Sequence, residues 1–215
     1  DVYEAAVKAH GIKVTTVAAH EDGKADYSAE VGTLASAGGD AVAVIGYLDQ
    51  GGKGIIQGSL DSGAFDTFIL SDGMIGDSLT DAFGKSLNKS FGSLPGSTGK
   101  GAGVFAKVAG KAGIDPSGPY TGESYDAAAL IVLAMQAGGS ADRSSIAKNV
   151  MAVANAPGKK IYPGQLKKAL DLLAKGQAVD YEGATGVIFT DVGEHVGNFL
   201  EKEIKGGKFK TKKQR

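Results

Sequence analysis

Two groups of residues that could bind a small polar molecule follow apolar runs in the first third of the sequence. Tyr47 comes just after AVAVI at 41–45, and Asp72 and Gly73 come just after DTFIL at 66–70. A tyrosine offers an apolar ring with a hydroxyl, a carboxylate accepts charge-assisted hydrogen bonds, and glycine lets a ligand approach the backbone. Together they suit a ligand with an ammonium group. The alternatives are a rim aromatic at Tyr47 and an ordinary turn at Asp72-Gly73, and spacing alone leaves them open.

A third candidate lies in GPYTGESYD at 118–126, where a loop leads into a long apolar helix. Tyr120, at the mouth of this helix, could stack on a ligand or form a hydrogen bond with it. Thr121 or Ser124 could cap the helix. A capped helix without any binding role is the alternative, and Tyr125 is assigned to the core.

The signatures of several enzyme classes are absent. The sequence has no G-x-S-x-G elbow, no P-loop and no G-x-G-x-x-G after a predicted strand. Its three histidines, His10, His20 and His195, are widely separated, so we expect surface residues rather than metal ligands. Without cysteine there is no disulfide or thiolate site. We therefore expect no catalytic residue, no metal and no cofactor.

The first eighty residues predict the elements that would position Tyr47 and Asp72. Apolar, β-rich runs at 12–18, 41–45 and 66–70 alternate with helical spacing at 27–37 and 50–60. Strands joined by helices form a parallel sheet, and ligands bind at the carboxyl ends of such strands. Because a helix at 2–9 has no strand before it, we also expect the sequence to begin inside a domain.

The second half is predicted to be mainly helical. After a Gly/Ser/Pro-rich stretch at 92–103, helices are expected at 104–112, 120–136, 144–154 and 163–173. Strands are predicted again only around 186–189, 196–204 and 209. With no strands between them, these helices form a bundle or cover a sheet that other residues supply.

Composition excludes several classes. The chain has 215 residues, 42% hydrophobic and 22% charged, as in soluble globular proteins. Its longest apolar run, 127–137, is about half of the ~20 residues that span a bilayer, so no membrane insertion is expected. The net charge of -1 gives no reason to expect nucleic acid as a partner. Seven basic residues lie in 202–215, which we predict to be a solvated, partly disordered tail rather than a binding patch.

Four segments in succession resemble the leucine/isoleucine/valine-binding proteins of bacterial ABC transporters. They are AGGDAVAVIGYLDQGGKGIIQGSLDSG, LSDGM, GIDPSGPYTGESYDAAALIVLAMQAGGSADR and DYEGATGVIFTDVGEHVG, and the resemblance extends over essentially the whole chain. It implies a type I periplasmic binding protein fold, which has two α/β lobes with parallel sheets that close on a ligand. It also implies that this chain is truncated at its N-terminus and that its first lobe is incomplete. The second lobe would comprise 1–95, the helical remainder of the first lobe 96–191, and 192–215 would return to the second lobe as strands and a basic tail.

The resemblance assigns roles to individual residues. Tyr47 matches a tyrosine that contacts the ligand, and Asp72 matches an acidic residue that accepts its α-ammonium group. Gly73 matches backbone that lines the pocket, and Tyr120 matches an aromatic residue against the ligand side chain. Asp in place of the commoner Glu at position 72 is shorter by one methylene, which leaves the exact ligand open. The family's carboxylate-binding serine and threonine would lie before residue 1.

These implications define the expected function. The chain is predicted to belong to a periplasmic, non-enzymatic solute-binding component of an ABC importer, with an amino acid as ligand and a membrane permease as partner. One alternative is a binder of the same fold for aromatic acids or amides, or a ligand-sensing regulatory domain. A less favoured alternative is an α/β enzyme that uses Asp72 as a general base near Tyr47.

Overall fold

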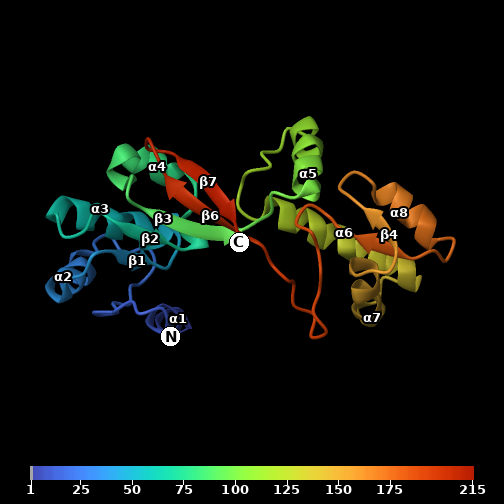
Figure 1. The fold of residues 1–215 in the computed structure, drawn as a ribbon, viewed down its shortest axis with the longest axis horizontal. Helices are drawn as coiled ribbons and strands as arrows, with labels where there is room; N and C mark the ends of the chain where they lie inside the picture. Colours follow the sequence, from blue (N-terminus) through green and yellow to red (C-terminus); the bar gives the residue numbers. More distant parts are fainter. Residues whose placement is uncertain (1) are drawn as a thin grey trace. The chain divides into compact units, whose positions relative to one another are not determined.

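A computed structural model describes residues 2–215 and divides them into two compact units (Figure 1). Unit 1 extends to Leu94 and includes Glu201–Lys212, whereas unit 2 comprises Pro95–Leu200 and Lys213–Arg215. Residues 192–200 thus group with unit 2, although we expected the return to the other lobe at 192. The assignment of the two units to lobes of a larger binding protein stays a prediction.

Unit 1 is built around a five-stranded sheet. Its spatial order is β1-β2-β3-β6-β7. The strands are β1 (Val42–Val44), β2 (Phe68–Leu70), β3 (Phe91–Pro95), β6 (Phe199–Ile204) and β7 (Phe209–Gln214). The first three run parallel, with Val42 opposite Phe68 and Ile69 opposite Phe91. The predicted α/β fold with a parallel sheet is confirmed.

Helices flank this sheet and complete its core. They are α1 (Val2–Ala9), α2 (Ser28–Ala37), α3 (Lys53–Ser62) and α4 (Asp77–Phe83), with short turns η1 (Leu48–Gly52), η2 (Asp72–Met74) and η3 (Gly84–Leu87). The largest completely buried apolar side chains of unit 1 come from strands, helices and turns alike: Ile56, Phe68, Met74, Leu79, Leu87 and Ile204. Burial of such side chains is the main favourable contribution to folding.

The predicted strand at Ile12–Ala18 is wrong. The segment has no strand hydrogen bonding, and Ile12 and Val17 are exposed. Its one described hydrogen bond from a side chain runs from the Thr15 hydroxyl to the Gly38 carbonyl, at 2.7 Å. β-branched residues favour an extended backbone, but a strand also needs a backbone ladder with a neighbour, which the sequence pattern does not reveal.

The Gly/Ser/Pro-rich stretch at 92–103 begins within a strand, because β3 includes Gly92. A Cβ at Gly92 would lie only 2.3 Å from the Leu70 carbonyl oxygen of β2. The glycine is therefore required for close approach of the two strands.

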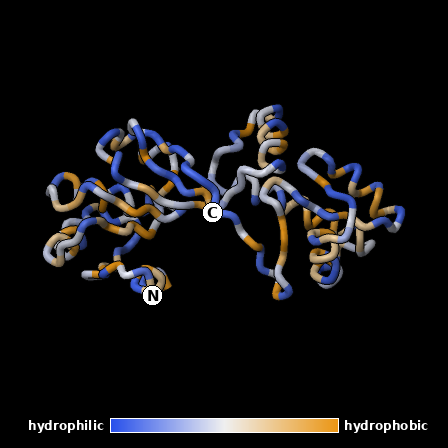
Figure 2. The backbone as a smooth tube through the Cα atoms, in the orientation of Figure 1, coloured by the Kyte–Doolittle hydropathy of each residue, from blue (hydrophilic) through white to orange (hydrophobic). Residues whose placement is uncertain are grey.

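The strands predicted around 196–204 and 209 are present as β6 and β7, so residues 202–215 are not the partly disordered tail that we expected. Strands β6 and β7 form an antiparallel hairpin in which Phe199 and Arg215 exchange backbone hydrogen bonds of 3.1 and 2.8 Å. The hairpin is mostly blue in Figure 2 because lysines are spread along it. β7 is one of the two edge strands of the sheet, and charged residues on an edge discourage pairing with other chains.

Unit 2 is dominated by helices α5 (Lys100–Lys111), α6 (Thr121–Gly138), α7 (Arg143–Ala154) and α8 (Leu166–Leu173). All four correspond to predicted helices. One face of α6 packs with α7, α8 and a short strand around a core that includes Leu133, Val153, Ala169 and Tyr181. Among the described helices, none combines the length and apolar character needed to cross a bilayer.

Unit 2 is not purely helical, contrary to expectation. β4 (Lys159–Ile161) and β5 (Val179–Tyr181) form a two-stranded parallel sheet. Both strands have only three residues, too few for a periodic signal to be recognised. The strand predicted at 186–189 is reduced to an isolated antiparallel bridge between Phe189 and His195.

Candidate functional site

The ends of β1 and β2 meet at one edge of the unit 1 sheet, as expected for neighbouring parallel strands. Ser71 connects them, since its backbone N–H donates to the Val44 carbonyl at 3.1 Å. Its hydroxyl also lies 3.3 Å from the Gly46 N–H and 3.2 Å from the Gly46 carbonyl oxygen. The backbone that leads to Tyr47 is thus joined to the backbone that leads to Asp72.

Tyr47 and Gly73 are in direct contact across this edge. A Cβ built on Gly73 would lie 2.8 Å from Cδ1 of Tyr47 and 2.5 Å from the Gly46 carbonyl oxygen. Only a residue without a side chain fits there. The Tyr47 side chain nevertheless remains 63% exposed, so most of its surface is available to a ligand.

Asp72 is the first residue of the short turn η2 and is half-buried. The turn is anchored by Met74, which is completely buried, and by a 3.0 Å hydrogen bond from the Ile75 N–H to the Asp72 carbonyl. The structure therefore brings Tyr47, Asp72 and Gly73 together at the carboxyl end of the sheet. Whether they bind a ligand stays a prediction.

Tyr120 lies in unit 2, just before α6, and has a rare backbone conformation. Its φ of 58° makes it the one non-glycine residue in 2–215 with a positive φ. Such a conformation is unfavourable for a bulky side chain and is often retained at functional sites. The Tyr120 side chain is 44% exposed. Both features are compatible with a ligand contact, which stays a prediction.

The predicted side-chain cap of α6 is wrong. The Thr121 hydroxyl donates to the Gly118 carbonyl in the preceding loop at 2.8 Å, so it does not accept from the helix backbone. Ser124 takes part through its backbone, because its N–H donates to the Tyr120 carbonyl at 2.9 Å. α6 has no hydrogen bond from a side-chain cap. Tyr125 packs at the edge of the core as predicted, with its ring 5.3 Å from that of Phe105. Its hydroxyl accepts a 2.8 Å hydrogen bond from the Gly164 N–H.

Asp126 is a buried carboxylate that the sequence analysis did not single out. It accepts hydrogen bonds from the Tyr181 hydroxyl, from the Ala184 and Thr185 N–H groups, and from the Thr185 hydroxyl, all at 2.8–3.0 Å. Burial, followed by the neighbouring Asp126 carboxylate, raises the pKa of Tyr181 far above its usual range. Asp126 therefore joins α6 to the segment after β5 and has a structural role. An aspartate within an apolar helix is the signal that could have revealed it.

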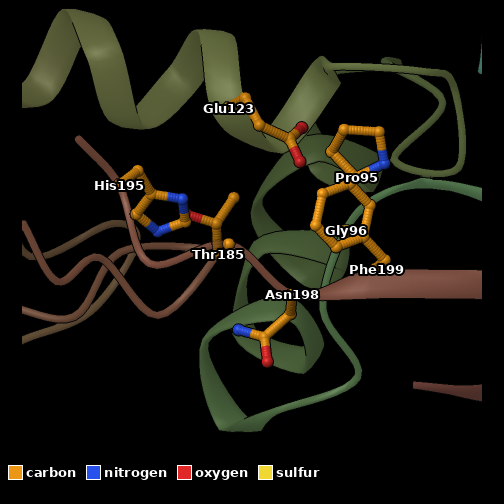
Figure 3. Close-up of a pocket in the computed structure, with 8 residues that line it drawn as sticks. Pro95, Gly96, Glu123, Thr185, His195, Asn198 and Phe199 are labelled. Carbon is orange, nitrogen blue, oxygen red and sulfur yellow. The ribbon is translucent and has the colours of Figure 1, made fainter. Parts of the chain in front are cut away.

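Unit 2 also contains a pocket of about 200 Å³ (Figure 3). Its lining is Pro95, Gly96, Glu123, Thr185, His195, Gly197, Asn198 and Phe199. The polar groups of two of these residues are occupied: the Thr185 hydroxyl by Asp126, and the Asn198 amide oxygen by Gln214 at 2.7 Å. None of the lining residues was predicted to bind a ligand. Within residues 2–215, no three His, Asp or Glu side chains converge to hold a metal ion.

The fold is that of the type I periplasmic binding proteins. A type 1 periplasmic binding protein from Bordetella pertussis superposes with a TM-score of 0.67 over 97% of this chain, at 20% identity. Among solved structures, the chain resembles members of the leucine/isoleucine/valine-binding group, as predicted. A leucine-binding protein from Thermotoga maritima has a TM-score of 0.65 over 89% of this chain at 19% identity. A branched-chain amino acid ABC transporter protein from Thermus thermophilus, solved with bound valine, has 0.66 over 98% at 17% identity.

One curated relative is detected by sequence. The chemotactic signal transduction system substrate-binding protein BasB of Halobacterium salinarum is 34% identical over 98 residues, which is 45% of this chain and 24% of BasB. No family model matches the sequence. The chain spans 49% of the Thermotoga structure and 55% of each of the other two. These similar proteins are solute-binding proteins rather than enzymes.

Proposed function

We propose that this chain is part of a solute-binding protein that captures a branched-chain or related amino acid. The observation that carries the proposal is the meeting of Tyr47, Asp72 and Gly73 at the carboxyl end of the sheet, where such folds bind ligands. The Asp72 carboxylate accepts hydrogen bonds from the ligand ammonium group, and the exposed Tyr47 ring lies against its apolar part. In unit 2, Tyr120 supplies a further ligand contact.

The cellular role is part of the proposal. The Thermotoga and Thermus proteins support delivery of the amino acid to a membrane permease in the periplasm, with closure of the two lobes on the ligand. BasB supports a second candidate, a binding protein that presents its ligand to a chemotaxis receptor. Both roles require the same first step, which is reversible ligand capture without turnover.

The test of capture is calorimetric titration of the protein with L-leucine and L-valine. We expect Asp72→Ala to weaken amino-acid binding by tenfold or more, which corresponds to about 1.4 kcal/mol or more, because the ammonium group loses its charged acceptor. Asp61→Asn is a matched control, since the Asp61 carboxylate accepts from Gln57 on the exposed face of α3, near the end of that helix remote from η1.

Two results would contradict the proposed site. An unchanged dissociation constant in Asp72→Ala would remove Asp72 from it, and an equal loss in Asp61→Asn would show a general effect of charge. A thermal-shift screen with amino acids, amides and aromatic acids separates the ligand classes, since a ligand that binds only the folded state raises the melting temperature. Chemical conversion of a bound compound would favour the enzyme alternative instead.

A further inference from the structure

The His20 side chain packs against residues 46–51, which carry Tyr47 and are called the Tyr47 segment below. A Cβ built on Gly46 would be 3.3 Å from both Cε1 and Nε2 of the imidazole, and one built on Gly51 would be 3.0 Å from its Cδ2. The ring therefore lies against the backbone on both sides of Tyr47. The His20 side chain is only 15% exposed, so the prediction of a surface histidine is wrong for this residue.

Tyr27 completes this support. Its ring meets that of His20 edge to face at 6.0 Å, and its hydroxyl would lie 2.6 Å from a Cβ on Gly51. The hydroxyl is fixed in turn, since it donates to the Glu21 carbonyl at 3.2 Å and accepts from the Lys24 N–H at 3.1 Å. The Tyr47 segment thus packs against the rings of His20 and Tyr27, and hydrogen bonds fix the Tyr27 ring in place.

The polar groups around His20 are incompletely paired. Nε2 of His20 and Oε2 of Glu30 are both buried without a hydrogen-bond partner among the described residues. The other Glu30 oxygen accepts from Lys24 Nζ at 2.5 Å, and Asp22 Oδ1 lies 3.9 Å from His20 Nε2. The charged residue within the Tyr47 segment is Asp49, whose carboxylate pairs with Lys53 at 2.7 Å. The imidazole therefore supports the Tyr47 segment by packing rather than by a hydrogen bond from Nε2.

We propose that His20 is a positioning residue for Tyr47, which acts by supporting the Gly46 and Gly51 backbone. The imidazole packs against both positions, and the Tyr27 ring packs against the imidazole. The Gly46 backbone is also held by hydrogen bonds with the Ser71 hydroxyl. A change at His20 should therefore alter the position of Tyr47, because the backbone around Tyr47 is fixed by these contacts.

The direct test observes Tyr47 without any ligand. The protein is labelled with 3-fluorotyrosine, and the Tyr47 signal among those of the seven tyrosines is assigned by its loss in Tyr47→Phe. We expect His20→Ala to change the chemical shift of this signal, because the cavity left by the imidazole allows the Gly46 and Gly51 backbone to move. His20→Gln, which fills part of the same space, should change it less. His10→Ala, which changes an exposed histidine of the same unit, should leave it unchanged.

A second measurement concerns binding and rests on the proposed function. With L-leucine as probe, we expect His20→Ala to bind about fivefold more weakly than the unaltered protein, because the Tyr47 segment loses its support, while His10→Ala retains the affinity.

The possible outcomes distinguish the two proposals. A Tyr47 signal that is unchanged in a folded His20→Ala variant would overturn the role of His20, and His20→Gln provides the same test if His20→Ala does not fold. An unchanged leucine affinity in a variant whose Tyr47 signal is also unchanged would overturn it as well. A Tyr47 signal that moves in these variants of a protein that binds no amino acid would instead support His20 and overturn the proposed function.

Discussion

At the scale of single residues, the candidate site depends on a glycine as much as on its charged and aromatic neighbours. Gly73 allows the Tyr47 ring and the Gly46 carbonyl to approach the η2 backbone within the distance that a Cβ would occupy. The φ at Gly73 is not positive, so the requirement is one of space rather than of backbone conformation. The need for space at Gly73 can be tested by a substitution there, which leaves the charge of Asp72 unchanged.

Gly73→Ala should destabilise unit 1 by about 1–3 kcal/mol, because Gly46 or Tyr47 must move to accommodate the methyl group. Amino-acid affinity should fall as well, since Tyr47 is displaced. Urea unfolding and calorimetric titration measure the two effects. The matched control is Gly32→Ala, at a helical position of α2 with nothing within 4 Å, where a gain of about 0.5–1 kcal/mol is expected. Equal stability changes in both variants would contradict the packing argument.

At this scale, the sequence predicted which residues meet at the ends of neighbouring strands. It did not predict contacts between residues that lie far apart in the sequence. Tyr47 and Asp72 were brought together correctly because parallel neighbouring strands end at one edge. The contact of His20 with Gly46 and that of Asp126 with Tyr181 were missed, since each joins residues 25 or more positions apart in the sequence. A side chain's type does not disclose which distant backbone it will meet.

At the scale of elements, α6 is fixed by a polar anchor as well as by its apolar face. The Asp126 carboxylate is buried and accepts from three residues on β5 and the segment after it. A Cβ on Gly183 would lie 2.5–2.6 Å from the carboxylate group, so that glycine lets the segment wrap around the anion. The first turns of α6 and the 181–185 segment therefore form one rigid joint.

Asp126→Asn should cost about 3 kcal/mol of unfolding free energy, because an amide nitrogen replaces an acceptor and faces N–H donors. Tyr181→Phe should cost less, about 1–2 kcal/mol, since it removes a single charge-assisted hydrogen bond. Chemical denaturation of both variants gives the comparison. A loss in Asp126→Asn no larger than in Tyr181→Phe would contradict the role of Asp126 as the shared acceptor.

The elements that sequence could predict are the long and periodic ones. α5, α6 and α7 each exceed ten residues, and their apolar spacing was recognised. β4 and β5 have three residues each, and β3 contains a glycine that chain propensity disfavours but the close approach of β2 requires. Residues 12–18 have the opposite character, with strand propensity but no ladder. In each case tertiary pairing overrides local preference.

At the scale of the whole molecule, one face of unit 2 remains apolar and uncovered among the described residues. α6 buries Leu130 and Leu133 on one side, while Ile131 and Val132 on the other are 47% and 42% exposed. A helix that is apolar all round is typical of one buried on both sides. In isolation, this 215-residue chain should therefore bind hydrophobic dyes and associate with itself.

Replacing both Ile131 and Val132 by lysine should lower dye binding and self-association while changing the unfolding free energy little, within about 0.5 kcal/mol for each exposed site. Leu133→Ala, at a completely buried neighbouring position, should cost about 2–5 kcal/mol. Dye fluorescence, light scattering and denaturation provide the measurements. Strong destabilisation by the double lysine variant would show that the outer face is packed after all.

The β6–β7 hairpin has a consequence for the order of folding. It pairs residues 199–214 with a sheet whose other strands lie between residues 42 and 95, so closing the sheet joins parts of the chain separated by more than a hundred residues. During synthesis, the edge of β3 that pairs with β6 stays open until residues 199–204 have left the ribosome. Pairings across such separations are slow and leave unpaired strands prone to aggregation. The lysines spread along the hairpin then help to keep it soluble until it docks.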